Sequence, residues 1–114
     1  DEDITIEETH KKKVHYLIER PSSSQIKKVK KKLGYICNGC GFDFEKVYGA
    51  LGKEYIEAHH LIPISELKKG ESRKITEKDF SVLCANCHRM IHRLDDSSNL
   101  DELQKLIAKM EERI

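Results

Sequence analysis

The chain has 114 residues, enough for one small domain. Its hydrophobic residues (38%) and charged residues (36%) have nearly equal shares, so we expect a thin core beneath a strongly solvated surface. The sequence contains neither a run of about 18 apolar residues nor a signal-peptide pattern at its start. We therefore expect a cytoplasmic protein that does not enter a membrane.

The net charge of +1 conceals strong segregation of charge along the chain. Residues 1–9 contain five acidic residues and no basic one, whereas residues 10–36 contain nine Lys or Arg and one Glu. A basic block beside a nearly neutral segment suits contact with a polyanion. A solvated, lysine-rich helix explains the same composition equally well.

The basic block contains the first predicted helix. Residues 1–21 have weak periodicity and are expected to be a linker or the end of a preceding element, and Pro21 with the three serines after it marks the boundary. Apolar residues then recur at helical spacing from Ile26 to Leu33, and Gly34 ends the helix. The other faces of this helix carry candidate phosphate contacts: Lys27, Lys28, Lys30, Lys31 and Lys32.

The character of the chain changes over residues 35–93, which contain all four cysteines and four of the six histidines. Residues 55–64 predict two short strands bent around an adjacent pair of histidines, with Pro63 closing the second strand. A polar connection over residues 65–79 follows, and then a short apolar run over residues 80–83.

Two further helices are predicted near the end of the chain. Residues 86–93 are expected to be helical, with Met90 and Ile91 as candidate core contacts. Asn99 is a candidate N-cap for the last helix. One apolar stripe on that helix predicts a packing face: Leu100, Leu103, Leu106, Ile107 and Met110.

Two CxxC pairs, Cys37 with Cys40 and Cys84 with Cys87, predict a structural zinc site. Four thiolates complete the tetrahedral shell of Zn²⁺ and leave no position open for chemistry. Disulfides need an oxidising compartment, and a redox motif uses one CxxC pair rather than two. The 43 residues between the pairs exceed the spacing of a compact zinc ribbon, so the ion is expected to connect distant segments.

Four histidines accompany the cysteines. Adjacent side chains on a strand point to opposite faces, so His59 and His60 should have different tasks. His88 and His92 lie four residues apart, which places both imidazoles on one face of a helix and suits a divalent cation. Each histidine alone is explained as well by a surface or core position. The four together, beside two CxxC pairs, favour a second metal site.

Residues 57–63 and 79–88 together resemble the HNH endonuclease motif. Residues 40–44 and 87–93 resemble, more narrowly, the HNH domains of restriction endonucleases, including those that cut DNA with modified cytosine. The resemblance covers about residues 35–93. It implies an α+β fold: a small, zinc-stapled ββα-metal domain with flanking N- and C-terminal helices.

The resemblance also assigns roles to the histidines. It makes His59 and His88 ligands of a catalytic divalent ion, His92 a further ligand, and His60 the general base. Asp79 stands where family members usually carry Asn; it can still accept a hydrogen bond and hold the loop or the imidazole of the base. The implied cofactors are a structural Zn²⁺ and a catalytic Mg²⁺, Mn²⁺ or other transition-metal ion.

Three further side chains are candidates for supporting roles. Glu57 precedes His59 by two residues and so shares its strand face, where it is expected either to orient that ligand or to support the metal site without binding the ion itself. Arg89 and Arg93 flank the metal helix and are expected to hold phosphate oxygens, although ordinary surface charge explains them equally well.

The sequence therefore predicts a metal-dependent DNA endonuclease over residues 22–114, the cleavage domain of a restriction-type enzyme. The alternative is a non-catalytic zinc module that binds nucleic acid, but such a module has no use for the additional histidines. An RNase or toxin nuclease of the same fold stays open, because phosphate contacts dominate both kinds of substrate. The expected partners are DNA and either a second copy of the chain or a recognition domain preceding Asp1.

Overall fold

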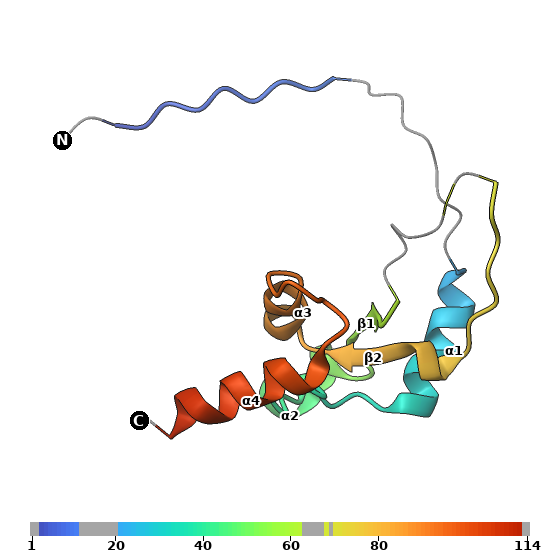
Figure 1. Ribbon diagram of the computed structural model, residues 1–114. Coiled ribbons are helices and arrows are strands. Elements are labelled where there is room, and N and C mark those ends of the chain that lie inside the picture. Colours follow the sequence, from blue (N-terminus) through green and yellow to red (C-terminus); the bar gives the residue numbers. More distant parts are fainter. Residues whose placement is uncertain (1–2, 12–20, 63–67, 69, 113–114) are drawn as a thin grey trace.

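The structure is a computed structural model that describes residues 3–11, 21–62, 68 and 70–112. Figure 1 shows two short strands at the centre, with one helix beside the start of the second strand and another directly after its end. This arrangement confirms the predicted α+β class. Within the described residues, every helix is too short or too polar to cross a bilayer. The helices, strands and 3-10 turns (η) are α1 (Ser23–Leu33), α2 (Phe44–Tyr48), η1 (Gly49–Gly52), β1 (Glu57–His60), η3 (Glu77–Asp79), β2 (Phe80–Leu83), α3 (Ala85–Ile91) and α4 (Leu100–Glu111).

The two strands form an antiparallel sheet, and His59 and His60 both belong to β1. The cross-strand partners are Glu57 and Leu83, Ala58 and Val82, His59 and Ser81, and His60 and Phe80. The prediction of two strands bent around the histidine pair is therefore wrong. The partner strand is instead the apolar run of β2, whose four residues are all buried, and the polar segment between the strands makes the connection.

The caps of the long helices agree with the sequence. Ser22 accepts the Gln25 N–H at 3.3 Å, and the Gln25 side chain accepts the Ser22 N–H at 3.0 Å, so a capping box starts α1. Gly34 adopts φ 95° and ends that helix, as predicted. Asn99 accepts the Glu102 N–H at 3.0 Å and caps α4. Residues 3–11 contain no helix or strand, and residues 12–20 and Pro63 lie outside the described residues.

Some predicted helix contacts differ from the structure. Met90 is 48% exposed and is not a core residue, whereas Ile91 is fully buried. The helix around it ends at Ile91, so His92 is its C-cap. In α4 only part of the predicted stripe packs on the core, because Leu106 and Met110 stay about half exposed. The short elements α2 and η1 were not predicted.

The hydrophobic core is small, and three of its members are cysteines. Its buried residues are Cys37, Ile56, Val82, Leu83, Cys84, Cys87, Ile91 and Leu103. The cysteine cluster thus lies inside the core and joins the loop before α2 to the segment from β2 to α3. In a chain of this size, a metal bound there would replace apolar contacts that the core does not have.

Asn38, inside the first CxxC pair, attaches this loop to the sheet. Its backbone N–H donates to the Val82 carbonyl at 2.9 Å, and its side-chain oxygen accepts the Val82 N–H at 3.1 Å. The Gln104 side chain of α4 donates to the Asn38 carbonyl at 2.6 Å. One residue therefore links three segments of the chain, across 44 positions to β2 and 66 to α4.

Replacing Asn38 with Ala should destabilise the domain, because the buried Val82 N–H loses its side-chain acceptor. We expect a loss of about 1–3 kcal/mol in the free energy of unfolding, measured by urea denaturation with zinc present. Asn86→Ala is the matched control, since Asn86 is, like Asn38, an exposed residue inside a CxxC pair, but its side chain makes no hydrogen bond to the described residues; this variant should unfold close to wild type. Equal unfolding midpoints for both variants would contradict this role of Asn38.

Candidate functional site

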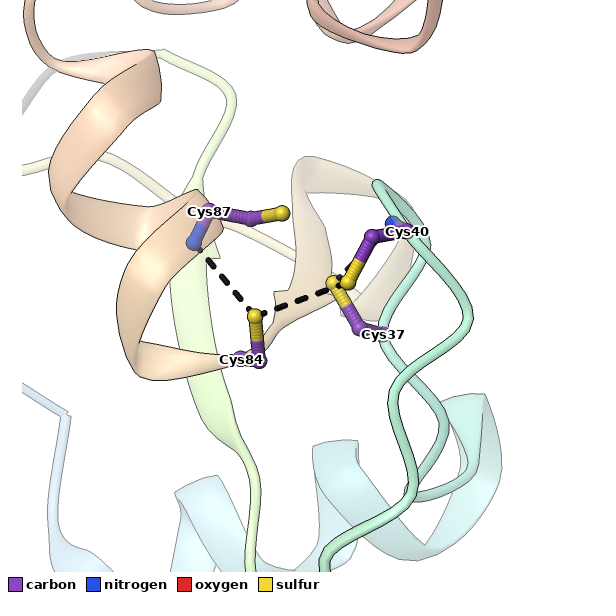
Figure 2. A group of neighbouring side chains, drawn as sticks. All are labelled: Cys37, Cys40, Cys84 and Cys87. Carbon is purple, nitrogen blue, oxygen red and sulfur yellow. Dashed lines mark hydrogen bonds between the residues drawn. The ribbon is translucent and has the colours of Figure 1, made fainter. Parts of the chain in front are cut away.

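The four cysteines come together in a geometry that suits one metal ion. One sulfur from each lies within 4.8 Å of all the others, and the Cys40 and Cys84 sulfurs are 3.8 Å apart. A tetrahedral site with Zn–S bonds of about 2.3 Å has sulfur–sulfur edges of about 3.8 Å. Figure 2 shows the side chains converging from the loop before α2 and from the start of α3. The cluster predicted from the CxxC spacing is therefore present.

Backbone N–H groups point at these sulfurs. The N–H groups of Gly39 and Cys40 lie 3.3 and 3.4 Å from the Cys37 sulfur, and that of Cys87 lies 3.4 Å from the Cys84 sulfur. Such donors stabilise negative charge on a thiolate. Gly39 is required because a Cβ there would lie 2.9 Å from the Cys87 sulfur.

Two of the thiols have pKa values shifted in opposite directions. Burial raises the pKa of Cys37, but hydrogen bonds from the backbone of Cys84, Cys40 and Gly39 outweigh it and lower the pKa to about 7. Burial, and then the neighbouring Cys37 thiol, raise the pKa of Cys87. Four thiolates so close together repel one another, and a divalent cation at their centre removes that repulsion. The donor set therefore fits a metal ion of the thiolate-binding kind.

A second cluster consists of His59 from β1, His88 from α3 and His92 at the end of α3. One ring nitrogen from each lies within 4.8 Å of the others. The centroid of the His59 ring lies 5.2 Å from that of His88 and 4.8 Å from that of His92. His59 is 2% exposed, His88 is half-buried and His92 is exposed. The cluster is thus closed on the strand side and open to solvent on the other, as a site that accepts both an ion and a substrate must be.

Hydrogen bonds determine which nitrogen carries the hydrogen in two of these rings. The His59 Nε2–H donates to the Ser97 carbonyl at 2.7 Å, because a carbonyl oxygen only accepts. The His88 Nδ1 lies 2.7 Å from Glu57 Oε1 and donates to that carboxylate. Nδ1 of His59 and Nε2 of His88 remain as lone-pair donors, the arrangement usual for histidines that bind metals.

Glu57 therefore contacts a different histidine from the one expected. The sequence predicted that it orients His59, its neighbour on the strand face, or supports the metal site without binding the ion. In the structure it reaches across to α3 and holds His88, while the carbonyl of Ser97 holds His59. Burial lowers the pKa of His59, and His92 and His88 lower it further against the opposing effect of the Ser97 carbonyl. A neutral imidazole is the form that binds a metal.

His60 and Asp79 lie at the end of the sheet where β1 ends and β2 begins. The register places His60 on the face of β1 opposite His59, with its ring 4.6 Å from that of Phe80. The Asp79 carboxylate accepts the Thr76 N–H at 2.8 Å, and the Asp79 carbonyl accepts the N–H of Leu61 at 2.8 Å. Asp79 thus ties the end of the long connection to the residue that follows His60.

The predicted phosphate contacts are not equivalent. Lys27, Lys28 and Lys31 are exposed on α1, whereas Lys30 is half-buried. Lys32 pairs with Glu77 at 2.7 Å, and hydrogen bonding to Lys32 lowers the pKa of that carboxyl. Arg89 and Arg93 are exposed beside the histidine cluster, on α3 and just after it.

Two contributors to the site were not predicted. The Ser97 carbonyl is a backbone group, so no residue type could signal it. Tyr55 donates its hydroxyl to the second carboxylate oxygen of Glu57 at 3.3 Å. The only sequence signal for Tyr55 was its position two residues before Glu57.

Comparison with known proteins agrees with this geometry. Residues 37–94 match the family described as HNH endonuclease, a segment that contains every residue of both clusters. The chain is also 34% identical, over 68 residues, to the type IV methyl-directed restriction enzyme EcoKMcrA of Escherichia coli strain K12. That alignment covers 60% of this chain and 22% of the enzyme, so the chain spans about a fifth of its relative's length. With half of its length matched to the family, this chain belongs to the HNH endonucleases.

Proposed function

We propose that this domain is a metal-dependent DNA endonuclease and the cleavage domain of a restriction-type enzyme. The observation that carries the proposal is the second cluster, three imidazoles that converge beside a separate set of four cysteines. A non-catalytic zinc module needs the cysteines alone. The relative's name, a methyl-directed restriction enzyme, supports DNA as the substrate. The alignment covers only 22% of that enzyme, and we propose that sequence recognition needs another domain or a second copy of the chain.

The two clusters are proposed to hold different ions. Four sulfurs select zinc and leave no ligand position open, so that ion is structural. His59, His88 and His92 would hold the catalytic ion, and nitrogen ligands favour Mn²⁺ or another transition metal over Mg²⁺, which prefers oxygen. When bound there, such an ion supplies Lewis-acid stabilisation of the charge that develops on the scissile phosphate.

His60 is proposed as the general base that takes a proton from the attacking water. It adjoins His59 in sequence but lies on the opposite strand face, which keeps it out of the ligand set. Asp79 holds the loop at the end of this strand through its bonds to Thr76 and Leu61. Arg89 and Arg93, both exposed, are proposed to contact phosphate oxygens, and the exposed Lys27, Lys28 and Lys31 are proposed to contact the DNA backbone further along the duplex.

Replacing Cys84 with Ser should release the zinc and cost most of the folded structure, because metal binding and folding are coupled in a small domain. Elemental analysis should find one zinc per wild-type chain, and circular dichroism should report the unfolding of the variant. His92→Ala is the control and should retain its zinc. Wild-type protein prepared without chelators that contained no zinc would refute the structural-zinc proposal.

Substitutions of the histidines should separate the base from the ligands. His60→Ala should lower plasmid nicking by about 10²–10⁴-fold and still bind Mn²⁺ in a titration. His88→Ala and His59→Ala should lose both Mn²⁺ and activity, and His92→Ala should lose part of each because water can replace a third imidazole. A His60→Ala variant that nicks DNA at the wild-type rate would contradict the assignment of the base.

Reversing the charge of Lys27, Lys28 and Lys31 together should weaken DNA binding and flatten its dependence on salt. Each lost phosphate contact should reduce the slope of log K against log [salt] by about 0.9. The control variant changes the net charge by the same amount but reverses three exposed lysines outside α1: Lys46→Glu, Lys53→Glu and Lys109→Glu. The same salt dependence in both triple variants would show that α1 is only a solvated surface.

A further inference from the structure

The Glu57 carboxylate uses both of its oxygens, and they face different groups. Oε1 accepts from His88 Nδ1 at 2.7 Å, and Oε2 accepts from the Tyr55 hydroxyl at 3.3 Å. A continuous chain of hydrogen bonds therefore runs from Tyr55 through Glu57 to one ring of the histidine cluster. A carboxylate held at one oxygen can still rotate, whereas one held at both presents a fixed acceptor to the imidazole.

Packing anchors Tyr55 independently of this hydrogen bond. Its ring stands edge-on to Phe44, with centroids 4.8 Å apart, and Phe44 packs in turn against Phe42 and Tyr48. Tyr55 is 47% exposed, so the contact with Phe44 holds the ring although much of the residue faces solvent. The nearby charge of Glu57 raises the pKa of Tyr55 further above neutral pH, where the phenol is protonated and can donate.

The groups that hold His59 and His88 are of different kinds. His59 is held by a backbone carbonyl, that of Ser97, whose position the fold determines. His88 is held by a side chain, Glu57, whose own orientation depends on a second side chain. Of these two rings, His88 is therefore the one whose orientation can vary while the fold is retained.

We propose that Tyr55 is a positioning residue of the metal site, acting through Glu57 to fix the tautomer and orientation of His88. This inference rests on the proposed function, in which the histidine cluster binds a divalent ion. In this role the Tyr55 hydroxyl raises metal affinity without touching the metal, the substrate or the reacting atoms. Groups that orient a ligand histidine commonly change metal affinity by about 10- to 100-fold.

A double-mutant cycle with Mn²⁺ as the probe tests this in the 114-residue chain. Glu57→Gln should weaken Mn²⁺ binding by about 10- to 100-fold. Tyr55→Phe keeps the ring and removes only the hydroxyl, and it should weaken binding by about 3- to 10-fold. Because Tyr55 acts through Glu57, adding Tyr55→Phe to Glu57→Gln should have no further effect.

Tyr48→Phe is the matched control, since it removes a hydroxyl from the same aromatic cluster, and no hydrogen bond joins that hydroxyl to Glu57 in the described part of the chain. It should bind Mn²⁺ like wild type. Zinc content and the thermal midpoint should be unchanged in the variants of Tyr55, Tyr48 and Glu57. In the metal-free protein, ¹H–¹⁵N NMR should show the Nδ1–H tautomer of His88 in wild type and a mixture of tautomers in Glu57→Gln.

The possible failures are distinct. If wild type bound no Mn²⁺, or bound only Mn²⁺ that the His88→Ala variant also retains, the proposed function would be refuted, and this inference with it. If wild type bound Mn²⁺ and Tyr55→Phe bound it equally well, only the role of Tyr55 would be refuted. An equal loss from Tyr55→Phe with and without Glu57→Gln would also refute it, since the hydroxyl would then act independently of the carboxylate.

Discussion

Three of the four clustered cysteines belong to the hydrophobic core, so the packing of this domain depends on how four sulfurs are held together. The cluster joins a loop before α2 to the first turn of α3, and Asn38 adds a hydrogen-bonded link to β2. An apolar core of this size cannot fix those segments alone. The sulfur cluster therefore sets where α3 begins and in which direction it leaves the sheet.

The position of α3 also matters for the histidine cluster. Cys87 and His88 are adjacent, so any shift of the first turn of α3 moves a ring of the histidine cluster as well. The alternation of β1 then separates the tasks of the neighbouring histidines, with His59 facing α3 and His60 facing the opposite side beside Phe80. The cysteine cluster and the histidine cluster thus share one helix, so a chain of 114 residues can support both with few elements.

The features that could be predicted from the sequence are those set by local chemistry. The CxxC spacing, the cap at Asn99 and the end of α1 at Gly34 each depend on residues close together in the chain. The partner strand of β1 could not be predicted, because the apolar run that pairs with it follows a long connection. The contact of Glu57 with His88 rather than His59 depends on the packing of α3 against β1, which strand periodicity does not contain. Backbone acceptors, such as the Ser97 carbonyl that accepts from His59, have no signal in the sequence.

We propose that two chemically distinct metal sites share α3. Anomalous diffraction from crystals of the wild-type chain grown with Mn²⁺ tests this arrangement. Data collected at the zinc and manganese edges should place zinc among Cys37, Cys40, Cys84 and Cys87, and manganese among His59, His88 and His92. Manganese bound away from the three histidines, or cysteine sulfurs without zinc between them, would contradict the account.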